Sequence, residues 1–194
     1  MRFLSFIKQI PEFSQLNLDD KVTLVKSNLL TVIGINSVLH YNSDKGQLIE
    51  CDSDMPLTTR FFRPLHGYET CEKIGKIFGS ILSIAKYDQN IIRITLIILI
   101  LTKSFSINDN SYGQTFNDDK SVQTAQNYFV ELLWKYMEAM HGYKTAFDLF
   151  TQLISRIISW QIIQEQITND VLRSLGPEDV DQLLPIFKSF VRIQ

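Results

Sequence analysis

The 194-residue chain has the length of one domain, and its 19 Lys and Arg against 21 Asp and Glu give a formal net charge of −2. Its 45% hydrophobic and 21% charged residues are typical of globular domains and exclude wholesale disorder. A slightly acidic chain also lacks the basic footprint of a nucleic-acid surface. Two cysteines, Cys51 and Cys71, cannot alone form a disulfide framework or a zinc site, so we expect a soluble, intracellular domain with reduced thiols.

The first part of the chain predicts two helices. Pro11 ends a helix over residues 3–10, because proline disfavours the helical conformation of the residue before it. A second helix is predicted over residues 21–41, with Asp19 and Asp20 just upstream, where the helix dipole favours negative charge. Since this second helix is apolar almost all round, we expect it to be buried on several sides.

A small β-element and further helices follow. A turn over residues 42–46 and weak alternation over 47–51 predict one short hairpin. Helix resumes near Leu57 and again over residues 72–85. The most apolar run, residues 91–101, is about half the ~20 residues that a membrane span needs, so it predicts a buried core helix.

The second half of the chain predicts a polar loop and long helices. Residues 103–120 are polar and predict a long surface loop. Amphipathic helices are predicted over residues 121–140 and 145–173, and a shorter one over 180–191. The sequence therefore predicts one all-α domain over residues 1–194, with a single small β-hairpin.

Motifs of enzymes are missing from the sequence. It contains no glycine-rich phosphate loop, no G-x-S-x-G nucleophile elbow and no histidine pair at zinc-binding spacing. His40, His66 and His141 are scattered over predicted helix ends and loops. We therefore expect a binding protein without a catalytic site, a metal site or a cofactor.

One segment carries a specific spacing of residue types. Phe6-Ile7-Lys8 is followed after four residues by Phe13, and the keyed positions beyond it are Leu16, Asp20-Lys21 and Leu24-Val25. The pattern itself indicates that Phe13 and Leu16 anchor a loop on the core, and that Asp20 begins the next helix. It leaves Lys8 and Lys26 on the outer surface, at the two ends of one groove.

This spacing resembles the signature of nuclear-receptor ligand-binding domains, most closely the peroxisome-proliferator-activated and Rev-erb-like receptors. The resemblance implies a three-layer helical sandwich around a lipophilic pocket, with the N-terminal helices of the family missing here. It implies a nuclear receptor with steroid-hormone-receptor-type activity that regulates transcription in the nucleus. It also implies a homodimer or a heterodimer with a retinoid-X-receptor-like partner, without membrane or direct nucleic-acid contact from this segment.

The resemblance also assigns a groove for coregulator helices, of the coactivator or corepressor kind. Lys8 matches the family's first clamp residue, and Lys26 matches its helper. In the C-terminal activation helix of the family a glutamate completes the clamp, and Ser189 holds that position here. A neutral hydroxyl cannot supply the charge-assisted bond that caps a helix N-terminus.

The remaining implied sites are a ligand pocket and a dimer seam. Polar pocket residues of the fatty-acid-sensing relatives are replaced by Leu30, Gln166 and Phe187, so an apolar or neutral small molecule is expected rather than an acid. The alternative is a pocket filled by side chains, which would leave an orphan dimerisation or corepressor module without ligand. The expected pocket residues are Leu30, Ile33, Ile81, Gln166 and Phe187, and the expected dimer residues are Phe150, Ile154, Ile157 and Trp160.

Overall fold

The computed structural model describes residues 6–49, 56–103 and 116–174 of the chain. Helices dominate these residues, which confirms the all-α class. The helices are α2 (Pro11–Gln15), α3 (Leu18–Ser37) with a short 3-10 helix (Val38–His40), α4 (Thr59–Ile84), α5 (Gln89–Ile100), α6 (Asp119–His141) and α7 (Tyr143–Ser174). The strands are β1 (Tyr41–Asn42), β2 (Gln47–Ile49) and β3 (Pro56–Thr58).

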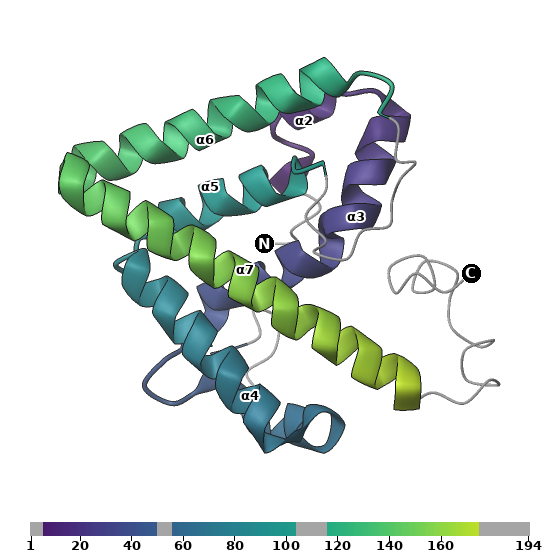
Figure 1. Cartoon of the computed structure of the whole chain (residues 1–194), viewed down its shortest axis with the longest axis vertical. Helices are drawn as coiled ribbons and strands as arrows, with labels where there is room; N and C mark the ends of the chain where they lie inside the picture. The colour runs from purple at the N-terminus through teal and green to yellow at the C-terminus, as the bar shows by residue number, and fades with distance from the viewer. Residues whose placement is uncertain (1–5, 50–55, 104–115, 175–194) are drawn as a thin grey trace.

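The helices pack in a chain of neighbours that runs from α3 through α5 and α6 to α7 and α4. Figure 1 shows α6 along the upper edge, α5 below it, and α7 crossing the molecule diagonally above α4. Helix α5 lies between α3 and α6, and α7 packs on α3, α4 and α6. As expected, the apolar run of α5 lies in the core, where its fully buried side chains are Ile91, Ile92, Leu96 and Ile100.

Helix α3 starts three residues earlier than predicted, because Asn17 caps it and Asp19 and Asp20 lie within its first turn. The side chain of Asn17 accepts a hydrogen bond of 2.8 Å from the backbone N–H of Asp20, which satisfies one of the free amides of the first turn. By length and composition Leu18–His40 could cross a membrane. Its buried Asp20 and Asn28 side chains, however, form hydrogen bonds with the backbone just before α6 and just after α5, as in the core helix of a bundle.

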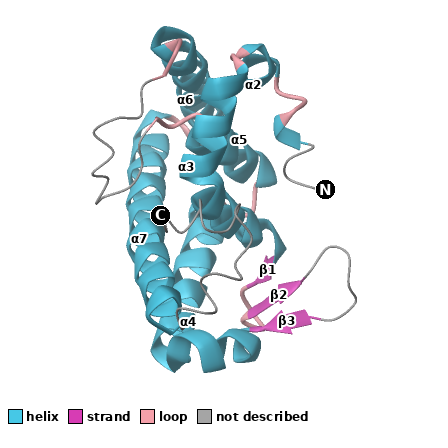
Figure 2. Cartoon of the chain, turned by 90° about the vertical axis from the view of Figure 1, so that its right-hand side faces the viewer, coloured by secondary structure: helices cyan, strands magenta, loops and turns pink. Residues whose placement is uncertain are grey.

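The sheet has three strands where the sequence predicts a hairpin. Strand β2 pairs antiparallel with both β1 and β3, with Leu48 opposite Tyr41 on one side and Leu57 on the other. Gly46, with φ of 59°, forms the turn between β1 and β2. Strands of two or three residues are too short to produce a measurable period-2 pattern, so β3 is not predicted from the sequence. Figure 2 shows the sheet on one side of the bundle.

Glycines mark the ends and bends of the long helices. The two helices predicted between residues 57 and 85 both lie within α4, which is interrupted at Gly67, where φ of 73° and ψ of 163° are not helical. Gly142, with φ of 75°, ends α6 and donates its N–H to the carbonyl of Glu138 at 2.8 Å. The predictions for α6 and α7 are therefore confirmed to within two residues.

Helices α3 and α7 approach each other at a notch. Gly34 is buried on α3, and the indole of Trp160 on α7 lies directly against it. A Cβ atom at position 34 would overlap the ring carbons of Trp160. The same indole packs on Phe78 of α4, with ring centroids 5.3 Å apart. Trp160 thus joins three helices, and only glycine fits opposite it.

Gly34→Ala is expected to lower the free energy of unfolding by about 1–3 kcal/mol, the range for overpacking a filled core. In a Trp160→Leu background the same substitution should cost much less, since the overlapping ring is gone. Urea denaturation measures both. Gly79→Ala is the matched control, because no atom lies within 4 Å of its added Cβ and alanine favours the helix. If Gly34→Ala lowers the free energy of unfolding equally in the two backgrounds, the close contact between Gly34 and the Trp160 indole is contradicted.

Candidate functional site

The segment before α3 is fastened to the core by regularly spaced apolar side chains. Ile7, Ile10, Phe13 and Leu16 are all buried. The Nζ of Lys21 donates a 2.6 Å hydrogen bond to the carbonyl of Ser14, which joins the end of α2 to the start of α3. The anchoring role expected for Phe13 and Leu16 therefore agrees with their placement.

The Asp20 carboxylate links the start of α3 to the start of α6. It is 1% exposed, and its Oδ1 accepts a 2.8 Å hydrogen bond from the N–H of Asn117. Its Oδ2 accepts from the N–H of Asp118 at 3.0 Å and from the side-chain amide of Asn17 at 2.6 Å. All three donors are neutral, and the positive ends of two helix dipoles face the carboxylate. Hydrogen bonds to a charged acceptor are among the strongest in proteins, so this link holds the first turn of α3 against the start of α6.

A face of α3 beside this link is left uncovered by the described residues. Leu18 is 73% exposed, and Val22 and Lys26 are also exposed. These three residues, spaced by four, lie on one side of the helix, and we call them the α3 face. Lys8 is exposed in the turn between residue 6 and α2. The two lysines therefore face solvent, as expected, and Ser189 lies outside the described residues.

The expected ligand-pocket residues do not converge. Ile33 is 48% exposed and Gln166 is exposed, whereas Ile81 is fully buried in the core. Leu30 is half-buried, and Phe187 lies outside the described residues. Among the described residues Ile33, Gln166 and Ile81 therefore do not line one pocket, because helix geometry turns the first two toward solvent, and the ligand pocket stays a prediction.

Two of the four expected dimer residues are also placed differently. Ile157 and Trp160 are buried in the core, so neither can contact another copy across the surface of α7. Ile154 is exposed and Phe150 is half-buried. The exposed apolar residues of this helix, which we call the α7 stripe, are Phe147, Ile154, Ile158 and Ile162.

Two buried polar atoms of α7 have no hydrogen-bond partner among the described residues. They are Nε1 of Trp160 and Oε1 of Gln164, one helical turn apart. Most buried donors and acceptors in proteins are paired, so both atoms could bond to a polar group that the described residues do not supply. No sequence signal points to either atom, since each depends on how α7 packs on α3.

Two cavities are lined by described residues away from the expected pocket. One, of about 210 Å³, lies between the end of α3 and the start of α5 and includes Asn36 and Arg93. Another, of about 320 Å³, lies between β1 and α4 and includes Tyr41 and Cys71. Within the described part of the chain, no three His, Cys, Asp or Glu side chains are grouped to hold a metal ion.

Comparison with models of known protein families finds no family that matches the chain. Comparison with curated proteins likewise finds no match. The functional interpretation therefore depends on the placement of the residues themselves.

Asp20→Asn is expected to lower the free energy of unfolding by about 1.5–3 kcal/mol, the range for hydrogen bonds to a charged group. The amide keeps the shape of the side chain but places a donor against backbone N–H groups. Asp19→Asn is the matched control, since Asp19 is exposed and accepts only a 3.3 Å bond from the side chain of Asn117. Denaturant titration that finds the two variants equally stable would contradict the link between α3 and α6.

Proposed function

We propose that the chain is a nuclear-receptor-type ligand-binding domain that regulates transcription by docking coregulator helices on the α3 face. The observation that supports this is the burial pattern of the signature residues. Phe13, Leu16 and Leu24 are buried and hold the segment in place, whereas Lys8 and Lys26 are exposed.

The docking would follow the ordinary physics of helix recognition. A short Leu-x-x-Leu-Leu helix would lay its leucines on the apolar part of the α3 face, made by Leu18 and Val22. The last carbonyls of that helix have no intrahelical partner and carry partial negative charge. Lys8 is the cation that would bond to these carbonyls, with Lys26 as its helper, and Ser189 would contribute no charge to the opposite end.

Two forms of the proposed domain differ in whether they bind a ligand. The pocket-filled module without ligand is favoured by the notch, since Trp160, Phe78 and Ile81 occupy the space between α3, α4 and α7. A neutral lipophilic ligand is favoured by the unpaired Nε1 of Trp160 and Oε1 of Gln164. We favour the pocket-filled module, because tight packing at Gly34 leaves no room beside the indole.

Lys8→Ala is expected to weaken binding of a Leu-x-x-Leu-Leu peptide by about 1–3 kcal/mol, because it removes a charged donor from the helix end. The stability of the domain should hardly change, since an exposed lysine contributes little. Fluorescence titration with a labelled peptide measures the affinity. Lys144→Ala, at an exposed position at the start of α7, is the matched control. If both variants bind the peptide like the wild type, Lys8 takes no part in docking.

The α7 stripe is the proposed seam for pairing with a second copy or a related receptor. Exposed apolar side chains in one row lose contact with water when two such faces meet. Because Ile157 and Trp160 are internal, the seam includes only residues that face solvent, such as Ile154 and Ile158.

Ile154→Glu is expected to abolish concentration-dependent self-association and to leave peptide docking unchanged. Leu18→Glu, an equally drastic change on the α3 face, should abolish peptide docking and leave self-association unchanged. Sedimentation velocity over a range of concentrations measures association, and peptide titration measures docking. A wild-type chain that sediments as a monomer at the highest concentration would refute pairing through the α7 stripe.

A further inference from the structure

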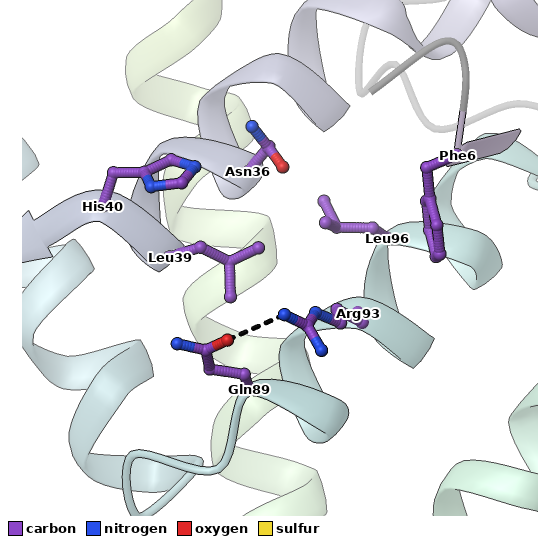
Figure 3. A pocket seen from close by; sticks show the side chains of 7 residues that line it. All are labelled: Phe6, Asn36, Leu39, His40, Gln89, Arg93 and Leu96. Carbon is purple, nitrogen blue, oxygen red and sulfur yellow. Dashed lines mark hydrogen bonds between the residues drawn. The ribbon is translucent and has the colours of Figure 1, made fainter. Parts of the chain in front are cut away.

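The cavity of about 210 Å³ between α3 and α5 combines an apolar floor with a polar rim. Leu39 and Leu96 point into its middle, and Phe6 closes one end (Figure 3). On the rim, Asn36 lies on the side of α3 and Gln89 and Arg93 lie on the side of α5. Side chains from three separate segments thus face one hollow.

Among the described residues of the rim, the exposed guanidinium of Arg93 carries a positive charge. Nη2 of Arg93 donates a 2.8 Å hydrogen bond to Oε1 of Gln89, one turn earlier on α5. This bond links the guanidinium to Gln89 beside the cavity, and its other N–H groups form no hydrogen bond with the described residues. A guanidinium presents its donors as a planar fork that matches the two oxygens of a carboxylate.

Acidic side chains do not offset this charge among the described residues that line the cavity. The nearest carboxylate in sequence, Asp88, accepts from the N–H of Asn90 at 2.8 Å and from the hydroxyl of Tyr136 at 2.7 Å. It is therefore engaged in capping α5 and in holding α6. Burial lowers the pKa of His40, so this rim residue is neutral at pH 7 and adds no second charge.

We infer that this cavity binds a small apolar monocarboxylate, with the carboxylate on Arg93 and Gln89 and the apolar body on Leu39, Leu96 and Phe6. The volume suits a single ring, since a cavity of about 150 Å³ lined by apolar side chains already accepts benzene. The site is separate from the α3 face, and the inference does not depend on the proposed coregulator docking.

The test is binding of phenylacetate to the full chain, followed by amide chemical shifts in NMR and by the unfolding temperature. We expect saturable shifts in residues 36–40 and 89–96, and an unfolding temperature that rises with phenylacetate concentration. Arg93→Gln should weaken binding roughly tenfold or more, because it replaces a charged donor by a neutral one. Phenylethanol, which has the same ring but no charge, should bind the wild type as weakly as phenylacetate binds Arg93→Gln.

Matched variants separate this site from general anion binding. Arg156→Gln removes an exposed arginine of α7 and should leave phenylacetate binding unchanged. Leu39→Trp should fill the hollow and abolish binding without removing any charge. The inference is overturned if phenylacetate causes no saturable shifts, if they lie outside the cavity, or if Arg93→Gln and Arg156→Gln bind alike.

Discussion

The Asp20 carboxylate is the interaction on which the arrangement of the helices depends. It is buried, and it accepts hydrogen bonds from the backbone N–H groups of Asn117 and Asp118, about a hundred residues later in the chain. A buried charge is stable only when donors surround it, so α3 and α6 must begin at the same place. This constraint fixes one end of α3, and with it the side of the helix that stays exposed.

Two further inward-facing residues of α3, one polar and one small, hold the helix against its neighbours. The side-chain amide of Asn28 donates to the carbonyls of Ile100 and Thr102, at 3.3 and 2.6 Å, and so caps the end of α5. Six residues further along α3, the missing side chain of Gly34 leaves room for the indole of Trp160 from α7. Each of these contacts faces inward, so the opposite side, with Val22 and Lys26, stays exposed among the described residues. The proposed docking surface is thus a consequence of how α3 is held.

Sequence analysis could predict the elements governed by local chemistry and not the contacts between them. The boundaries of α6 and α7 follow from amphipathic periodicity and from Gly142, and the burial of Phe13 and Leu16 follows from their spacing. The bond from Asp20 to Asn117 could not be predicted, because no local pattern joins residues so far apart. Trp160 was expected at a dimer seam, since α7 is apolar over more than one face and periodicity does not tell which face meets α3. The cavity at Arg93 is lined by residues of three separate segments, so the sequence of no single segment predicts it.

The central claim is that the inward contacts of α3 leave its opposite face to bind a coregulator helix. Photo-crosslinking tests it most directly, with a Leu-x-x-Leu-Leu peptide that carries a diazirine on its second leucine. Mass spectrometry of the crosslinked chain should find the peptide attached within residues 18–26, and an excess of unlabelled peptide should suppress the crosslink. Attachment to residues 147–162 of α7, or crosslinks that unlabelled peptide does not suppress, would contradict the account.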